Sequence, residues 1–286
     1  MTALSSVSYA LGNVFVNGAY AAGVQPGTAA FLRFAVASLA LVPFLTLSGR
    51  WTPLPRKKIV TLLLLGLLAY SALGITWFLS ISLSPVWLVA LVNAALLPLL
   101  VNVGSWAILG EAIDRHKGLA LTLVIAGSLA LFWQPFEDAV LSGVLVMVGN
   151  CIIYALFQVV AQRWTRGVPP EMSAAWMCIG AMPSTLLYAH LVGELSFGFA
   201  PLGWLWAALF GLISTALAIM CLWWGIGLIG AARAAIISAI DPPLSVLFSV
   251  VILGQPMAPA QVVGGVIILI GVVLIRIQPK RRVPRP

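Results

Sequence analysis

The chain has 286 residues, of which 62% are hydrophobic and 8% are charged, and its formal net charge is +8 at pH 7. A soluble globular domain carries about 25% charged residues, so this composition excludes that class and indicates a membrane protein. The positive charge does not indicate nucleic-acid binding, because the basic residues lie in short segments between apolar runs.

Apolar runs of about 20 residues fill nearly the whole chain, and each is long enough to cross a bilayer core as a helix. Irregular backbone cannot face lipid, so we expect every run to be helical. The ten predicted spans are residues 4–22, 28–47, 58–80, 86–108, 117–133, 139–162, 173–192, 202–225, 232–253 and 259–276. The first span has no basic region before it, so it is interpreted as a retained helix and not as a cleaved signal peptide.

The sequence also repeats itself. Moving residues 66–135 forward by 144 positions places them on residues 210–279, so that Pro98 meets Pro242 and Gly110 meets Gly254. A second match, at an offset of 137, places Asn13 on Asn150. The fold class predicted is therefore an all-α polytopic membrane protein with two homologous halves. Because each half has five spans, the second half is inverted in the membrane relative to the first. The ten transmembrane helices form two inverted five-helix repeats, residues 1–135 and 136–279, followed by a basic cytoplasmic tail at 280–286.

The basic residues are distributed unevenly between the two sides. If the N-terminus lies in the cytoplasm, 14 of the 15 Lys and Arg residues fall on the cytoplasmic side. The charged residues of the opposite loops are all acidic. This is the positive-inside rule, and it predicts that both termini are cytoplasmic. The exception, Arg33, lies inside span 2 near its external end, where it can snorkel to the headgroups. Contact with a substrate carboxylate is the alternative.

The segment that runs from Pro98 through Ile108-Leu109-Gly110-Glu111 to Gly127, together with its counterpart from Pro242 to Gly271, resembles the EamA-type branch of the drug/metabolite transporter superfamily. Arg33-Phe34 fits the same family, and the resemblance covers the whole chain. It implies a bacterial inner-membrane exporter of small organic solutes, with amino acids, including aromatic ones, as the expected substrates. Cationic drugs or other metabolites are the alternative. The sequence departs from the family pattern at Gln255 and at Asp241-Pro242-Pro243.

Polar residues inside the spans indicate where a central cavity lies, because polar groups that face lipid gain nothing. Two stripes have a spacing of four residues, which places their members on one helix face. The first stripe is Tyr9, Asn13 and Asn17; the second is Asn150, Tyr154, Gln158 and Gln162. Hydrogen bonds between neighbouring helices are the alternative role for these amides. In spans 3 and 8, Tyr70 and Ser71 correspond to Ser214 and Thr215, and Trp77 adds aromatic surface for a side chain or a cation.

Pro98 and Pro242 remove backbone donors at equivalent places in the two halves, which predicts paired kinks that act as hinges. A kink that only improves packing is the alternative. Asp241 lies near the middle of span 9, so we expect it to face the cavity and to bind a substrate ammonium or exchange a coupling proton. The alternative is a protonated side chain bonded to backbone that the prolines free. The predicted substrate-binding residues are Asn13, Asn17, Tyr70, Ser71, Trp77, Asn93, Asn150, Tyr154, Gln158, Ser214, Ser238 and Asp241, with Pro98 and Pro242 as hinges.

Other classes of function are less consistent with the sequence. A membrane-embedded enzyme needs clustered His, Cys or carboxylates, yet the two histidines lie far apart and the three cysteines sit singly in spans. No enzyme activity, metal or cofactor is therefore expected, and no phosphate-binding loop motif is present. A channel or scaffold stays open as a further class. The expected partners are a small-molecule substrate and the lipid bilayer, with no nucleic acid. A homodimer through the Gly-rich spans 5 and 10 is left open.

Overall fold

The computed structural model describes residues 1–84, 86–131, 141–253 and 258–276, and all regular secondary structure in these ranges is helical. The first half contains α1 (Thr2–Ala21), α2 (Pro26–Leu47), α3 (Arg56–Leu64), the π-helical segment η1 (Leu65–Tyr70), α4 (Ser71–Leu83), α5 (Val86–Leu109) and α6 (Arg115–Leu131). The second half contains α7 (Leu141–Trp164), α8 (Pro170–Leu191), α9 (Pro201–Gly211), the π-helical segment η2 (Leu212–Leu217), α10 (Ala218–Ile229), α11 (Ala231–Ser238), α12 (Asp241–Leu253) and α13 (Pro259–Arg276).

Within the described ranges, each of the predicted apolar runs falls mainly on helix, and the run at 232–253 is divided by a turn at Ala239 and Ile240. In the described residues, six helical stretches are long and apolar enough to cross a membrane: Pro26–Leu47, Arg56–Trp77, Leu88–Leu109, Leu141–Trp164, Pro201–Ile229 and Ala231–Ile252. Helix α13 adds a shorter apolar stretch, Pro259–Leu274. Helix α1 has 20 residues but carries several serines and asparagines, and α6 has only 17 residues. Length and hydropathy alone therefore single out fewer segments than the sequence predicts.

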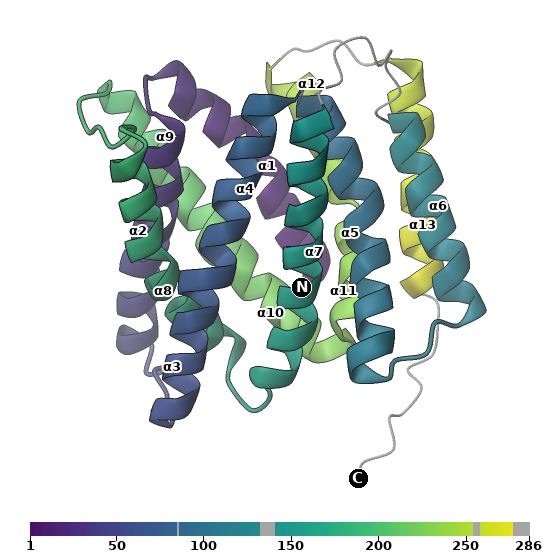
Figure 1. Ribbon diagram of the computed structural model, residues 1–286, viewed down its shortest axis with the longest axis horizontal. Helices are drawn as coiled ribbons and strands as arrows, with labels where there is room; N and C mark the ends of the chain where they lie inside the picture. The colour runs from purple at the N-terminus through teal and green to yellow at the C-terminus, as the bar shows by residue number, and fades with distance from the viewer. Residues whose placement is uncertain (85, 132–140, 254–257, 277–286) are drawn as a thin grey trace.

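The helices lie side by side in one bundle (Figure 1). Helix α2 packs on α8, and α6 packs on α13 at the right-hand edge of the view. Helix α1 contacts α9, α10 and α12 of the second half, while α7 contacts η1, α4 and α5 of the first half. The two halves are therefore interleaved rather than set side by side, and the main buried hydrophobic cluster draws chiefly on α2, α7, α8 and α10.

Two glycines allow helices of the two halves to approach closely. A Cβ on Gly66 would meet the carbonyl oxygen of Met177, and a Cβ on Gly180 would meet that of Leu63. The backbones of the α3–η1 helix and α8 therefore touch at these points. Small residues at helix crossings are typical of packing in a bilayer, where dispersion contacts drive association.

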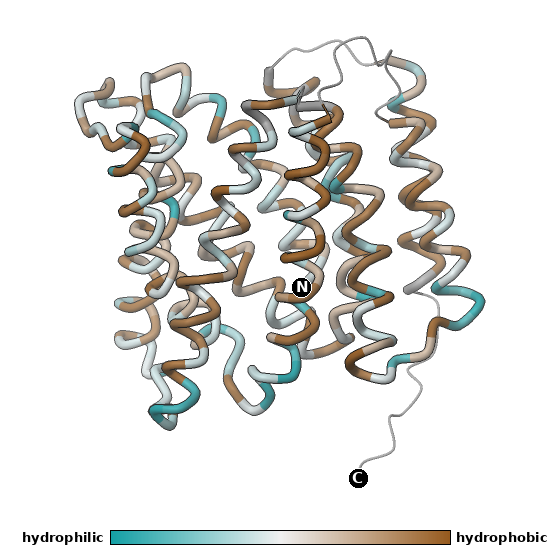
Figure 2. The backbone as a smooth tube through the Cα atoms, in the orientation of Figure 1, coloured by the Kyte–Doolittle hydropathy of each residue, from teal (hydrophilic) through white to brown (hydrophobic). Residues whose placement is uncertain are grey.

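The outer surface of the bundle is apolar. Large side chains such as Leu39, Leu47, Leu191 and Val251 are more than two-thirds exposed, at 74%, 87%, 73% and 71%. Figure 2 shows apolar residues along the helices and hydrophilic residues gathered at the lower ends, where the loops before α6 and after α7 lie. An exposed apolar band with polar ends matches a lipid environment rather than water.

Candidate functional site

The interior of the bundle contains polar atoms that have no partner. In the described part of the chain, buried atoms without a hydrogen bond include Ser6 Oγ, Arg33 Nε, Tyr70 OH, Gln158 Oε1, Trp223 Nε1 and Asp241 Oδ1. These atoms come from α1, α2, η1, α7, α10 and α12, which are elements of both halves. Buried polar groups are nearly always paired, so each of these atoms can still form a hydrogen bond, for example with a ligand.

Three tyrosines link these groups. Tyr9, Tyr70 and Tyr154 all lie within electrostatic range of Arg33, and the rings of Tyr70 and Tyr154 both neighbour that of Phe157. The carboxylate of Asp241 acts on Tyr154, whose hydroxyl also neighbours Gln158. These six residues, Tyr9, Arg33, Tyr70, Tyr154, Gln158 and Asp241, are called the central cluster below.

Aromatic rings form one wall of the central cluster. Tyr70 meets Phe157 edge-on with ring centroids 5.0 Å apart, and Phe34 meets Tyr70 at 5.8 Å. Phe157 in turn meets Trp223 edge-on at 5.7 Å. Edge-to-face contacts of this kind hold rings in fixed orientations. The wall therefore offers a rigid apolar surface beside the polar groups.

The guanidinium group of Arg33 lies against aromatic rings of both halves. Its guanidinium carbon lies 4.9 Å from the centre of the Phe34 ring and 5.1 Å from that of Phe210, and its Nε is buried. Ring faces stabilise the cation but satisfy none of its in-plane N–H donors. In the described residues, no carboxylate forms an ion pair with it.

Asp241 lies at a break in the membrane helix. Helix α11 ends at Ser238 and α12 begins at Asp241, with a turn at Ala239 and Ile240 between them. Pro242 occupies the first turn of α12, where the missing N–H costs nothing. A carboxylate inside a membrane span costs about 2.5–3.5 kcal/mol, and the N-terminus of α12 offsets part of that cost. Ser6 on α1 is one of its polar neighbours.

The residues of the first predicted stripe have different surroundings along α1. Tyr9 reaches the central cluster, whereas Asn13 Nδ2 donates to Ser245 Oγ on α12 at 2.9 Å. Asn13 and Asn17 are both exposed. Asn13 therefore joins α1 to α12 one turn away from the cluster.

The residues of the second stripe differ as well. Asn150 is 3% exposed and donates to Leu73 O at 2.9 Å and Thr76 Oγ1 at 2.7 Å, which joins α7 to α4. Tyr154 and Gln158 lie in the central cluster. In this structure the amide donors of Asn150 are therefore engaged by α4.

The remaining predicted residues lie outside the cluster. Ser71 bonds to Gly66 O and Ser184 Oγ, and Ser214 Oγ donates to Ser8 O at 2.6 Å. Trp77 packs near Met147, Asn93 Oδ1 accepts from Cys151 Sγ at 3.7 Å, Ser238 ends α11, and Pro98 lies inside the continuous helix α5. Cys151, Cys178 and Cys221 are buried free thiols.

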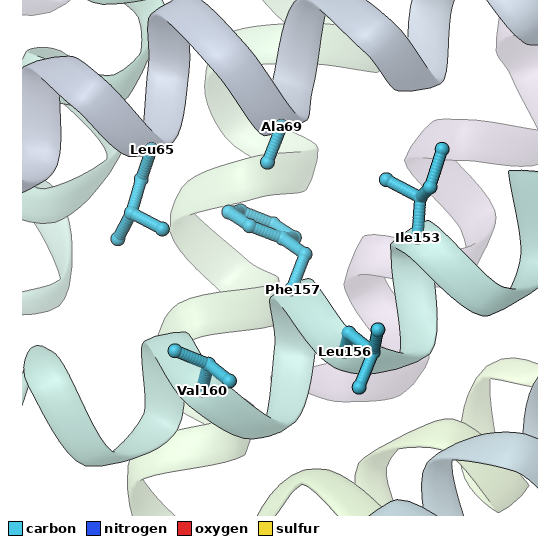
Figure 3. Close-up of a pocket in the computed structure, with 6 residues that line it drawn as sticks. All are labelled: Leu65, Ala69, Ile153, Leu156, Phe157 and Val160. Atoms are coloured by element: carbon cyan, nitrogen blue, oxygen red, sulfur yellow. The ribbon is translucent and has the colours of Figure 1, made fainter.

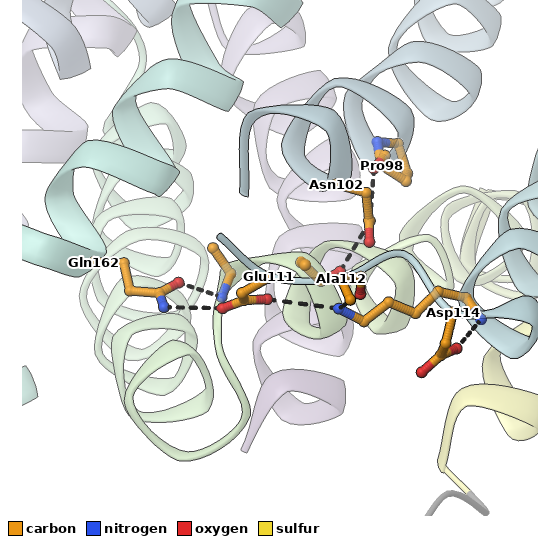
Figure 4. Close-up of polar contacts among 9 residues, drawn as sticks. Pro98, Asn102, Glu111, Ala112, Asp114 and Gln162 are labelled. Atoms are coloured by element: carbon orange, nitrogen blue, oxygen red, sulfur yellow. Dashed lines mark hydrogen bonds and ion pairs between the residues drawn. The ribbon is translucent and has the colours of Figure 1, made fainter. Parts of the chain in front are cut away.

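A polar network surrounds Glu111 and Gln162 (Figure 4). Gln162 Nε2 donates to Glu111 Oε1 at 3.4 Å, and Gln162 Oε1 accepts from the Ala231 N–H at 2.5 Å. Lys117 Nζ pairs with Glu111 Oε2 at 3.6 Å. The network, made of Glu111, Lys117, Gln162 and the Ala231 backbone, connects α6 and α7 to the start of α11.

An apolar crevice of about 270 Å³ lies between η1 and α7 (Figure 3). It is lined by Leu65, Ala69, Ile153, Leu156, Phe157 and Val160. Without a polar lining group it suits a hydrocarbon chain better than a charged solute. Phe157 separates it from the central cluster, because the same ring contacts Tyr70 and Trp223.

Sequence reasoning missed part of the site. Phe157 is an apolar residue in an apolar helix, so no sequence pattern distinguishes it from an ordinary packing residue. In the described ranges, no three His, Cys, Asp or Glu side chains gather closely enough to hold a metal ion.

An apolar bundle of helices with charged groups in its interior defines a multi-pass membrane protein. The chain belongs to the EamA-like transporter family, whose model matches residues 1–133 and 141–277. It is 24% identical over 263 residues to the uncharacterized transporter YyaM of Bacillus subtilis, which covers 87% of this chain and 83% of that protein. It is 26% identical to an uncharacterized transporter of Archaeoglobus fulgidus, with 95% and 93% covered. A solved crystal structure shares the fold, with a TM-score of 0.79 at 19% identity, over 96% of this chain and 94% of that chain.

Proposed function

We propose that this membrane transporter exports small organic solutes, amino acids first among them, across the bacterial inner membrane by alternating access. The observation that carries the proposal is the central cluster. Its residues come from α1, α2, η1, α7 and α12, which belong to both halves, and four of its polar atoms are buried without a hydrogen bond: Arg33 Nε, Tyr70 OH, Gln158 Oε1 and Asp241 Oδ1. Such groups are costly in a membrane interior and are typical of a substrate path.

The architecture proposed is ten transmembrane helices in two inverted repeats, residues 1–135 and 136–279. The packing supports it, because the α1 contacts with α9, α10 and α12 correspond to the α7 contacts with η1, α4 and α5. The α2–α8 and α6–α13 pairs each join equivalent helices of the two halves. Inverted repeats give two related packings, one open to each side, which is the basis of alternating access.

The orientation proposed places both termini and the basic loops in the cytoplasm. The helix ends that carry Arg56, Arg115 and Arg163 lie together at the lower end in Figure 1. Under this orientation, the Glu111–Lys117–Gln162 network lies on the cytoplasmic side, and the exposed Asn13 and Asn17 lie toward the outside. The proposal is that the network ties the cytoplasmic side together while the external side is open.

An exporter of cationic drugs or other metabolites is the second candidate, because Asp241 and the aromatic wall suit a cation. Arg33 disfavours a purely cationic substrate, since it places a positive charge in the same cluster. A channel is less well supported, because the Glu111–Lys117–Gln162 network ties one end of the bundle together. An enzyme is less well supported, because the central cluster contains no nucleophile.

Counterflow in proteoliposomes tests the proposal. Vesicles with purified protein are loaded with one unlabelled amino acid, and uptake of the same labelled compound is followed against protein-free vesicles. A carrier produces transient accumulation above equilibrium, whereas a channel only equilibrates the label. Accumulation of one or more of the twenty amino acids is expected. If none accumulates while a cationic dye such as ethidium does, the drug exporter replaces the amino-acid exporter.

A further inference from the structure

We infer that this protein binds an anionic phospholipid at one defined place on its outer surface. The phosphate headgroup lies against the basic residues at the lower ends of α3 and α7, and one acyl chain lies in the apolar crevice between η1 and α7. The inference names a lipid partner and does not depend on which solute the transporter carries.

The crevice suits an acyl chain. Its lining residues are all apolar, and its volume is about 270 Å³ (Figure 3). Leu156 on its α7 side and Leu68, next to Ala69 on η1, are exposed, so the crevice lies at the outer surface of the bundle, where a membrane supplies lipid. Along α7 the lining extends from Ile153 to Val160, which is about 10 Å of helix. A hydrocarbon chain there gains dispersion contacts that an empty hollow lacks.

The two helix faces that line the crevice become basic toward its lower end. Lys58 on α3 lies seven residues before the lining residue Leu65, and Arg163 on α7 lies seven residues after the lining residue Leu156. Seven residues are about two turns, which return to the same helix face about 10 Å further along the axis. Because α3 begins and α7 ends at the lower end of the bundle, both basic residues lie below the crevice (Figure 1).

A direct contact holds these two helix ends together. Lys58 Nζ donates to the carbonyl oxygen of Trp164 at 2.6 Å and to that of Arg166 at 3.3 Å. The lysine thereby joins the start of α3 to the end of α7, where a cation is favourable for the helix. The contact brings two short basic segments side by side. Their basic residues are Arg56, Lys57, Lys58, Arg163 and Arg166.

The protein supplies little negative charge to these residues. Residues 56–58 and 163–166 include no acidic side chain, and all of their basic residues except Lys58 are exposed. In the part of the chain that the structure describes, none of them forms an ion pair. The next acidic residue along the chain is Glu171, in the first turn of α8. Clusters of Lys and Arg beside a membrane helix attract anionic headgroups, and Arg can bind phosphate with two parallel hydrogen bonds.

The bound chain contacts the aromatic wall of the central cluster. Phe157 lines the crevice, and the same ring lies 5.0 Å from that of Tyr70 and 5.7 Å from that of Trp223. The lipid site and the interior of the bundle therefore share one side chain.

The test measures lipid binding to the full-length protein in detergent. Phosphatidylglycerol, which is anionic, and phosphatidylcholine, which is zwitterionic, are compared with identical palmitoyl and oleoyl chains, and bound lipid is followed by native mass spectrometry. We expect phosphatidylglycerol to bind at least about fivefold more tightly, because each basic residue near the headgroup contributes about that factor. Glycerol 1-phosphate, which has no chains, should not displace it.

The variants separate the headgroup from the chain. Arg163→Gln should weaken phosphatidylglycerol binding about fivefold and leave phosphatidylcholine binding unchanged, and Arg166→Gln is a second variant of this kind. Arg115→Gln, an exposed residue at the same end on α6, is the matched control. Ala69→Leu fills the crevice and should weaken phosphatidylglycerol binding several-fold, whereas Ala126→Leu on an exposed face of α6 should not. Size-exclusion profiles check that each variant folds.

Each outcome bears on the inference. Equal affinity of wild type for the two lipids overturns it. So does an equal loss of phosphatidylglycerol binding in Arg115→Gln and Arg163→Gln, because the effect then belongs to the whole basic surface. Unchanged binding in folded Ala69→Leu overturns the placement of the chain in the crevice. Displacement by glycerol 1-phosphate overturns the lipid in favour of a site for free phosphate. All of these outcomes leave the proposed transport function untouched.

Discussion

The hydroxyls of Ser71 and Thr215, which lie 144 positions apart, make the same hydrogen bond. Each donates to the carbonyl oxygen five residues earlier, Gly66 for Ser71 and Phe210 for Thr215, and each bond is 3.2 Å long. Both bonds lie at the π-helical segments η1 and η2, which interrupt the third helix of each half. A widened turn leaves carbonyls poorly paired, and the two hydroxyls compensate for this.

We predict that removing either hydroxyl destabilises the protein. Ser71→Ala and Thr215→Val should each cost about 1 kcal/mol, because a buried carbonyl loses a donor. Thermal unfolding in detergent measures the effect. Thr122→Val is the matched control, since its hydroxyl makes an ordinary bond to Gly118 O at 3.1 Å on an exposed face of α6. Equal melting temperatures for all three variants would show that the π-helical turns do not depend on these bonds.

A second prediction concerns the close approach of η1 to α8. Gly66→Ala should lower the melting temperature, because the new Cβ would collide with the Met177 carbonyl oxygen. Gly74→Ala is the control in the following helix α4, where a Cβ meets nothing within 4 Å. There the higher helix propensity of Ala should leave stability unchanged or raise it by up to about 1 kcal/mol. The prediction fails if Gly66→Ala is as stable as Gly74→Ala.

The network at the lower end gives a third prediction. Gln162→Ala removes the link between Glu111 and the start of α11, so this end should open more often. A cysteine introduced by Ala232→Cys, at a position only 1% exposed, should then react several times faster with a maleimide. The background lacks the three native cysteines.

Gln261→Ala is the control for that experiment. Gln261 Oε1 also accepts a backbone bond, from the Ala258 N–H at 3.0 Å, but at the opposite end of the bundle. An equal labelling rate in both variants would mean that Gln162 does not hold the lower end closed.

A fourth prediction addresses orientation. Thr52→Cys lies in the loop before α3 at the lower end, and Gly198→Cys lies in the loop before α9 at the upper end; both positions are exposed. In intact cells, an impermeant maleimide should label position 198 and should reach position 52 only after permeabilisation, because the basic loops stay in the cytoplasm. The reverse pattern would place the termini outside.

Much of the fold could be predicted because helix is the one structure that an apolar run can adopt in lipid. The runs at 28–47 and 259–276 agree with α2 and α13 to within two residues. The π-helical segments could not be predicted, because widening one turn leaves length and composition unchanged. The two prolines predicted to form equivalent kinks also have different surroundings. Pro98 lies inside the continuous helix α5, whereas Pro242 lies in the first turn of α12.

The site was predictable where a residue is costly in lipid. Asp241 stands out in sequence for that reason, and in the structure it lies within electrostatic range of Tyr154. Amide residues indicate the position of the site less reliably than charged residues do. Asn150 bonds to α4, whereas Gln158, on the same stripe, keeps its Oε1 unpaired. The direction of the Arg33 side chain depends on the rings of Phe34 and Phe210, and the Phe210 ring lies on a helix of the other half.

The difference between continuous α5 and the broken α11–α12 pair means that the two halves of the chain are not interchangeable. If the protein alternates between two packings, exchanging the roles of the halves does not reproduce the same molecule, and the two packings differ in free energy. The transporter then has a preferred resting side. A substrate offered to the disfavoured side must first draw the protein out of its resting state, so its apparent affinity is weaker there. The ratio of the apparent affinities from the two sides therefore reports how unequal the halves have become.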